Sequence, residues 1–163
     1  MSPALFTLRP YQTTEFDDAL SLWQRAWQLA YPQIDFSKRL DWFREHWSNL
    51  LLESKVVVAE FSNPPSLNPP GLNPPNLAGF VVVSPRTGYL DQIVVAPEAQ
   101  RMGIGQALLG AAKQIGHEGL YLHVNKDNAR ALAFYQASGF VIAGEDINRR
   151  SGAPVYMMTW RPS

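Results

Sequence analysis

The 163-residue sequence contains no cysteine, which excludes disulfide bonds, a thiolate nucleophile and cysteine-based zinc sites. The three histidines, His46, His117 and His123, lack the short spacing of metal ligands, so no metal is expected. A charge excess of either sign is also missing, because 14 basic residues balance 14 acidic ones. This balance gives no electrostatic reason to expect nucleic acid or an anionic membrane as a partner.

Long hydrophobic runs are absent as well. The longest, Leu77 to Val83, is interrupted by Gly79 and is far shorter than the roughly 20 residues that a membrane helix needs. No signal peptide heads the sequence, so we expect a cytoplasmic protein with no membrane partner. Hydrophobic residues make up 46% of the chain, and residues 1–163 are expected to form a single domain.

Proline is concentrated in one segment, where the pattern Asn-Pro-Pro-x-Leu occurs three times within residues 63–77. The segment lies between two β-branched stretches, residues 55–61 and 78–84, which are predicted as strands two and three. Proline lacks the N–H group that a sheet requires, so the strands cannot continue through the repeats. We therefore interpret residues 63–77 as an insertion in a loop, a solvated tip rather than a partner-binding proline motif.

The remaining pattern predicts an α/β fold. Helical spacing of apolar residues predicts two early helices, 13–30 and 36–50, whose aromatic stripes are expected to be core. Two later helices are expected after the glycine turn near residue 103 and after Asn128. Further strands are predicted at residues 5–8, 89–96, 120–124, 141–143 and 155–160. This order favours a mixed, mostly antiparallel sheet of about seven strands with four helices on both faces.

The turn Gln100-Arg101-Met102-Gly103-Ile104-Gly105 joins the strand at 89–96 to a helix. The first N–H groups of a helix have no intrahelical partner, and the helix dipole adds positive charge there, so phosphate binds well at such a turn. Neither a P-loop nor a dinucleotide fingerprint is present, since Gly105 is followed by Gln106-Ala107-Leu108. The alternative is a glycine-relaxed turn that binds no ligand.

A second block runs from Asn125 through Asn128 to Tyr135 and Gly139-Phe140. It predicts a helix with Asp127 or Asn128 at its N-cap and Gly139 just beyond its end. Asn128 and Tyr135 are seven residues apart, so both side chains point the same way. The alternative is a short amphipathic helix that uses Tyr135 as a core aromatic.

Together, the two blocks resemble the GNAT superfamily of N-acetyltransferases over roughly residues 88–141, in order, spacing and intervening elements. The pattern is most similar to bacterial amine and protein N-terminal acetyltransferases. The resemblance implies that the fourth and fifth strands run parallel and splay apart, with the pantetheine arm of the co-substrate acetyl-CoA in the gap. It also implies cofactor contacts from Ile93, Val94, Val95, Arg101, Met102, Gly103, Ile104, Gly105, Gln106, Asn128 and Tyr135.

The resemblance further implies direct attack of a primary amine on the acetyl thioester. Tyr135 matches the general acid that protonates the departing thiolate, and a backbone N–H within Ile93-Val94-Val95 matches the oxyanion donor. His123 occupies the position of the base in the N-terminal acetyltransferase branch, where glutamate is the closer match. A half-buried structural histidine is equally compatible with the sequence, and Asp91 or Glu60 acting through water are further candidate bases.

The acceptor is expected to be a small-molecule amine or a peptide N-terminus, bound by a monomer or homodimer. Trp42 and Phe36 are candidates for contact with it, because in the family the connection between the first two helices borders the acceptor pocket. The alternative function is a non-catalytic acyl-CoA-binding sensor or partner module. A general acid at Tyr135 argues against this alternative, since a protein that only binds has no need of an acid near sulfur.

Overall fold

The structure, a computed structural model, describes residues 5–63 and 77–163. Its strands are β1 (Phe6–Pro10), β2 (Lys55–Phe61), β3 (Leu77–Val83), β4 (Leu90–Val95), β5 (Leu120–Asn125), β6 (Val141–Ile147) and β7 (Pro154–Trp160). Its α-helices are α1 (Phe16–Ala30), α2 (Leu40–Glu53), α3 (Ile104–Ile115) and α4 (Ala129–Ala137). Three short 3-10 helices precede α1, α2 and α3, namely η1 (Thr13–Glu15), η2 (Phe36–Arg39) and η3 (Pro97–Ala99).

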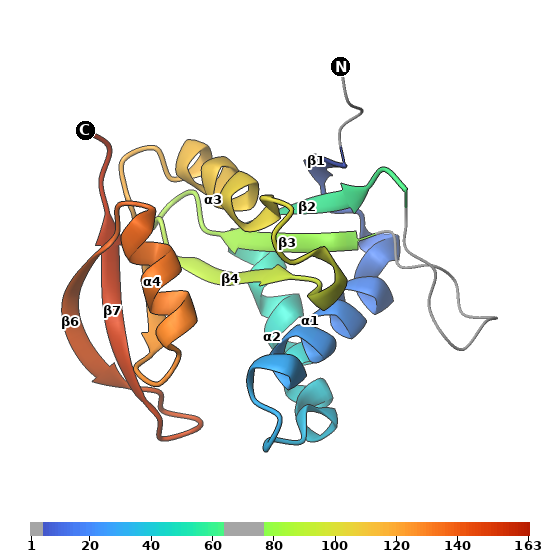
Figure 1. Cartoon of the computed structure of the whole chain (residues 1–163), viewed down its shortest axis with the longest axis horizontal. Helices are drawn as coiled ribbons and strands as arrows, with labels where there is room; N and C mark the ends of the chain where they lie inside the picture. The colour runs from blue at the N-terminus through green and yellow to red at the C-terminus, as the bar shows by residue number, and fades with distance from the viewer. Residues whose placement is uncertain (1–4, 64–76) are drawn as a thin grey trace.

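The strands form two antiparallel sheets that meet where β4 and β5 begin (Figure 1). One sheet has the order β1-β2-β3-β4 and the other has the order β5-β7-β6. A parallel bridge between Tyr89 and Tyr121 joins them, and the Tyr121 N–H donates to the Gly88 carbonyl at 3.0 Å. Beyond this bridge the two strands separate. The expected mixed, mostly antiparallel arrangement with strands four and five splayed is therefore confirmed.

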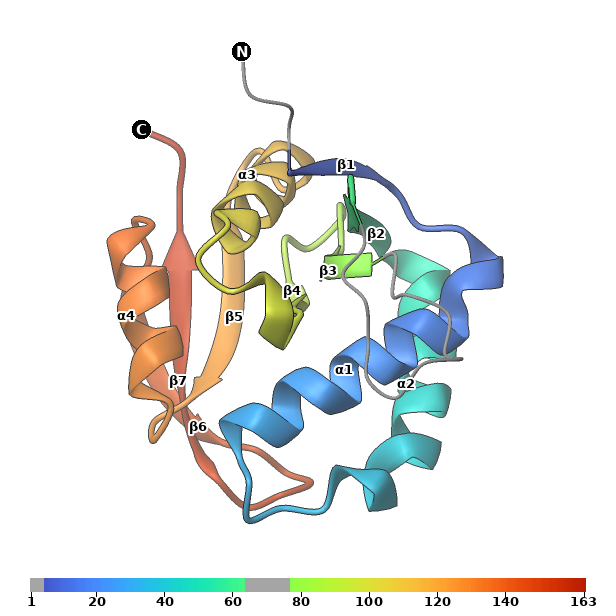
Figure 2. The same ribbon diagram turned by 45° about the vertical axis from the view of Figure 1, so that its right-hand side comes forward.

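Helices cover both faces of the first sheet, with α3 on one face and α1 and α2 on the other, while α4 packs beside the second sheet (Figures 1 and 2). The aromatic stripes of α1 and α2 form much of the core, as predicted. Trp23 stacks on Phe43 with ring centroids 4.5 Å apart, and Trp47 meets Phe80 of β3 edge-on at 5.3 Å. These large buried rings fix α1 and α2 against the sheet through apolar burial.

The sequence underestimates the length of β6, which was expected to cover residues 141–143 and extends to Ile147. Most of its side chains are exposed, so the apolar alternation that identifies a half-buried strand is missing. The strand is held by pairing with β7, and the register shifts between Ile142 and Gly144. A β-bulge of this kind is common at sheet edges.

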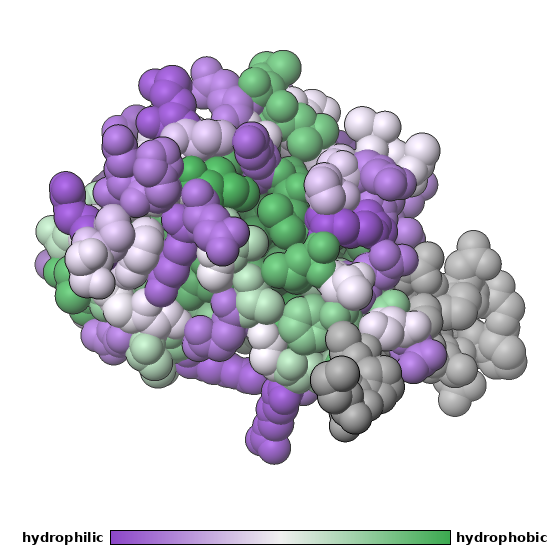
Figure 3. All heavy atoms as spheres, turned by 90° about the horizontal axis from the view of Figure 1, so that it is seen from above, coloured by the Kyte–Doolittle hydropathy of each residue, from purple (hydrophilic) through white to green (hydrophobic). Residues whose placement is uncertain are grey.

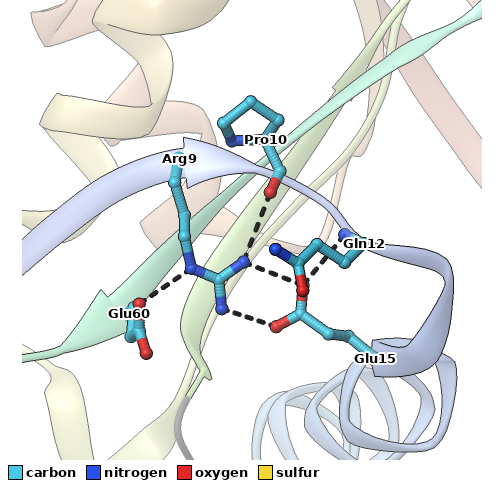
Figure 4. A network of polar contacts seen from close by, with 5 residues as sticks. All are labelled: Arg9, Pro10, Gln12, Glu15 and Glu60. Carbon is cyan, nitrogen blue, oxygen red and sulfur yellow. Dashed lines mark hydrogen bonds and ion pairs between the residues drawn. The ribbon is translucent and has the colours of Figure 1, made fainter.

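Arg9 connects β1 to β2 and to η1 through hydrogen bonds (Figure 4). Its guanidinium donates to Glu60 of β2 at 2.8 Å and to both carboxylate oxygens of Glu15 at 2.8 and 2.6 Å. These hydrogen bonds hold the pKa of Glu15 below its usual range, so their contribution to stability is lost as the pH falls through that lowered pKa. Glu60, one of the candidate bases, lies two strands from β4 and is engaged in this ion pair.

Of the repeat segment 63–77, residues 64–76 lie outside the described residues. The flanking strands are described, and β2 pairs with β3 from Lys55 opposite Val83 to Glu60 opposite Leu77. Because this pairing continues to Leu77, the last residue of the repeat segment, a short turn should suffice to close the hairpin. We expect that replacing residues 64–76 with Asn-Gly leaves the melting temperature nearly unchanged. A large drop in the melting temperature, measured by thermal denaturation, would show that the repeats contribute to the folded core.

On the face seen from above, hydrophobic surface is bordered by hydrophilic side chains (Figure 3). None of the helices within residues 5–63 and 77–163 combines the length and apolarity that a bilayer crossing requires.

Candidate active site

A cavity of about 590 Å³ lies between the last turns of α1, the end of β4, the start of α3 and α4. Its size is that of a small-molecule site. Every residue predicted to contact the cofactor lines this cavity except Met102, which is half-buried against the core. Trp27, which the sequence assigned to the core stripe, also forms part of its wall. The two sequence blocks, about 30 residues apart, therefore meet in one place.

The turn into α3 has the backbone of an anion-binding loop. Arg101 and Gly103 adopt left-handed conformations, with φ of 68° and 81°, and α3 starts at Ile104 without a side-chain cap. The first amides of this helix therefore keep their hydrogen-bonding capacity for a ligand. A Cβ atom placed on Gly103 would meet nothing within 4 Å, so the loop leaves open space at this point.

The free edge of β4 borders the same cavity. The Ala96 N–H donates to the Ala78 carbonyl of β3 at 2.8 Å, so alternation along the strand directs the N–H groups of Val95 and Ile93 away from β3. They point into the gap where β4 and β5 separate. Two of the three residues predicted to supply the oxyanion donor thus present their amides to this gap.

Tyr135 of α4 is 8% exposed, and its ring packs near Phe134 and Phe140 with centroids 5.3 and 5.6 Å away. Burial raises the pKa of Tyr135 well above its ordinary value, and the neighbouring Tyr89 raises it further. The hydroxyl therefore remains protonated at neutral pH and can act as a donor. Tyr135 both packs in the core and lines the cavity, so it can contact a ligand there.

Asn128 is the N-cap of α4, one of the two positions that the sequence proposed. Its side-chain oxygen accepts from the Ala131 N–H at 3.2 Å. The same residue lines the cavity, so the cap fixes the start of α4 beside the cavity. On the opposite wall, Gln100 accepts from Arg130 at 2.6 Å, which ties the turn before α3 to α4.

His123 lies outside the cavity lining, on the face of β5 that it shares with Tyr121 and Asn125. Its Nδ1 atom is 2.9 Å from the hydroxyl of Tyr89, which also packs against the Tyr121 ring at 4.7 Å. Burial, followed by the charge of Asp91, raises the pKa of Tyr89 well above its ordinary value. Tyr89 also raises the pKa of Tyr135, so it acts electrostatically on the predicted acid while contacting the predicted base.

Asp91, another candidate base, occupies a β-bulge in β4. Gln92 pairs with Val82 whereas Leu90 pairs with Val83, which leaves Asp91 as the extra residue. The bulge turns the carboxylate of Asp91 toward α2, where its Oδ2 atom is 2.7 Å from Nε2 of His46. The side-chain amide of the adjacent Gln92 donates to the same oxygen at 3.3 Å. The sequence assigned no role to Tyr89 or His46, because only the β4–β5 bridge and the bulge bring them to the site.

The described residues contain no cluster of three or more His, Cys, Asp and Glu side chains that could hold a metal ion. The site brings together helix and strand amides, the buried phenol of Tyr135, the half-buried phenol of Tyr89 and the imidazole of His123. Such a set can bind a phosphate-bearing ligand, stabilise an oxyanion and transfer protons.

Curated proteins similar to this chain are acetyltransferases. The peptidyl-lysine N-acetyltransferase YiaC of Escherichia coli is 38% identical over 84 residues, which cover 52% of this chain and 56% of that protein. The mycothiol acetyltransferase of Clavibacter sepedonicus is 30% identical over 154 residues, which cover 91% of this chain and 47% of that protein. The chain thus spans about half the length of these relatives.

Among solved structures, the PaiA N-acetyltransferase of Thermoplasma acidophilum in complex with coenzyme A shares the fold, with a TM-score of 0.72 and 18% identity over 99% of this chain and 100% of that one. The ribosomal-protein-S18-alanine N-acetyltransferase of Escherichia coli has a TM-score of 0.66 and 23% identity, covering 97% and 94% of the two chains. Residues 16–140 match the model of the acetyltransferase (GNAT) family. Because that match includes both motifs and the whole cavity wall, the chain belongs to the GNAT acetyltransferase family.

Proposed function

We propose that the protein transfers the acetyl group of acetyl-CoA directly to a primary amine. The observation that carries this proposal is the meeting of three features in one cavity: the uncapped start of α3, the open edge of β4 and the hydroxyl of Tyr135. The α3 amides and the space beside Gly103 suit a pyrophosphate, and the gap between β4 and β5 suits the narrow pantetheine arm.

Each group at the gap has a chemical task in such a transfer. The N–H groups of Val95 and Ile93 would stabilise the negative charge that develops on the thioester oxygen as the amine attacks. As the carbon–sulfur bond breaks, Tyr135 would donate its proton to the sulfur, which leaves as a thiol. The raised pKa of Tyr135 keeps that proton in place until charge builds on the sulfur.

The acceptor amine must lose a proton, and the geometry favours His123 as the base, acting through Tyr89. The Tyr89 hydroxyl keeps its own proton at neutral pH because burial raises its pKa, so it can donate to Nδ1 of His123. A proton from the amine then passes to the Tyr89 oxygen while the Tyr89 proton passes to His123. Asp91 is less suited to this role because its carboxylate is already paired with the imidazole of His46.

This relay predicts a specific pattern of kinetic effects. His123→Ala should lower turnover by about 10²-fold and remove the acidic limb of the pH–rate profile, since a protonated imidazole cannot accept a proton. Tyr89→Phe keeps the ring but removes the hydroxyl, and should produce a loss of similar size. If the two act in series, the double variant should be no slower than the slower single variant.

Tyr121→Phe is the matched control, because it removes a hydroxyl from the same ring pair without touching His123. It should retain the pH–rate profile of the native protein. Additive losses in the double variant, or an acidic limb that persists in His123→Ala, would exclude the relay.

The proposed activity itself is tested by release of thiol from acetyl-CoA in the presence of a panel of primary amines. We expect at least one amine to accelerate release by orders of magnitude over the rate without amine. Binding of acetyl-CoA with no amine-dependent release would instead favour the non-catalytic sensor.

A further inference from the structure

A cationic side chain covers a half-buried aromatic ring on the side of the first sheet that α2 occupies. Arg150, in the turn between β6 and β7, places its guanidinium carbon 3.4 Å from the centre of the Trp42 ring on α2. Figure 2 shows this turn beside the segment that joins α1 to α2. The contact therefore joins two segments far apart in the sequence.

Side chains in contact lead from Arg150 inward to β4. Trp42 stacks on His46 with ring centroids 4.6 Å apart and planes 15° from parallel. His46 in turn bonds Asp91 at 2.7 Å, in the bulge that precedes the open edge of β4. Asp91 also acts electrostatically on Tyr89. A chain of side-chain contacts thus links Arg150 to Asp91 in β4, beside the gap where we propose that the amine reacts.

A second cation, Arg39, lies near Arg150 and Trp42. Arg39 precedes Trp42 by three residues, about one helical turn, and its guanidinium lies over the Phe36 ring at 5.0 Å. Partial burial lowers the pKa of Arg150, and the positive charge of Arg39 lowers it further, while the charge of Asp91 acts in the opposite direction. The two guanidinium groups are therefore close enough to repel each other.

Neither guanidinium forms an ion pair with a described residue, although the more distant Asp91 acts electrostatically on Arg150. Among residues 5–63 and 77–163, no carboxylate lies within ion-pair distance of Arg39 or Arg150. The segments outside the described residues contain no Asp or Glu that could supply one. Both cations are held on aromatic rings, and no hydrogen bond to a described residue occupies their guanidinium N–H groups, so together they form a suitable site for an anionic group.

We propose that Arg39 and Arg150, held on the Phe36 and Trp42 rings, bind an anionic group of the acceptor. The acceptor is then an amine that also carries a carboxylate or a similar anion several bonds from its amino group. This inference rests on the proposed acetyl transfer and narrows its substrate class. The same two cations disfavour polyamines, whose additional charges they would repel.

The test uses matched acceptors, namely ω-amino acids of increasing chain length and the corresponding uncharged amides. For at least one chain length, the acid should exceed its amide in kcat/KM by about 10- to 100-fold, the worth of a hydrogen-bonded charge pair. Arg150→Gln should remove most of this preference by raising KM for the acid, while the rate with the amide stays the same. Arg149→Gln, which changes the neighbouring exposed arginine, should preserve the preference.

The outcomes separate this inference from the proposed function. Acetylation of acids and amides at equal rates, or a preference that survives Arg150→Gln, would overturn the anion site and leave acetyl transfer standing. A preference for polyamines would overturn it as well. Failure of every amine, charged or neutral, to release thiol would contradict the proposed function itself.

Discussion

Replacing Tyr135 with phenylalanine should reduce turnover by 10²- to 10⁴-fold, which is about 3–5 kcal/mol of activation free energy. The substitution removes only the hydroxyl, while the ring keeps its packing near Phe134 and Phe140. Folding and acetyl-CoA affinity should therefore be nearly unchanged, and the loss should appear in kcat. Steady-state kinetics with a good amine measure kcat and the apparent affinity for acetyl-CoA, and a thermal denaturation curve measures folding stability.

Tyr156→Phe is a suitable control, because it removes a hydroxyl from a half-buried tyrosine of β7 outside the cavity. It should leave kcat unchanged. The raised pKa of Tyr135 adds a further expectation: native turnover should not decline through ionisation of this group at any pH below about 10. Tyr135→Phe retaining more than about half of native turnover would remove the residue from the mechanism, since positioned acid catalysis is worth far more.

Acetyl-CoA at 100 times its dissociation constant should stabilise the native protein by about 2.7 kcal/mol, a rise of roughly 5–10 °C in melting temperature. Gly103→Val should abolish this rise. The valine side chain would project into the open space beside the α3 amides, where the pyrophosphate is expected. Thermal denaturation with and without acetyl-CoA gives the result directly.

The sequence alone suggests that Gly103→Val leaves the fold intact, but the structure adds a backbone cost. Gly103 has a φ of 81°, which a β-branched residue adopts only with strain. Gly152 in the β6–β7 turn is a matched control, because its φ is 74° and a Cβ there also meets nothing within 4 Å. Gly152→Val should lose similar stability yet keep the full response to acetyl-CoA. Equal ligand responses in the two variants would exclude the α3 turn as the pyrophosphate site.

Local sequence patterns predicted the elements that carry the cofactor space. A run of β-branched residues predicted β2 at its observed bounds, and the glycine turn predicted the start of α3. Asn128 was one of two N-cap candidates for α4, because a side-chain oxygen there can satisfy a free helix amide. These signals are local, so one chain suffices to reveal them.

The acceptor side could not be predicted in the same way, because its contacts are tertiary. The position of His46 beside Asp91 depends on a one-residue bulge in β4, and no pattern in the sequence predicts that bulge. The Tyr89–His123 pair depends on a single parallel bridge between two sheets. Trp42 was a candidate for substrate contact, but its cover by Arg150 follows from where the β6–β7 turn lies.

The most direct test of the account is a product measurement. Native protein, acetyl-CoA and the amine that most accelerates thiol release are incubated together, and the acetylated amine and free thiol are quantified by mass spectrometry and a thiol reagent. We predict one acetylated amine for each thiol released, with both products suppressed in Tyr135→Phe and Gly103→Val and both retained in Tyr156→Phe. Thiol release without acetylated amine, or acetylation that continues at the native rate in both site variants, would contradict it.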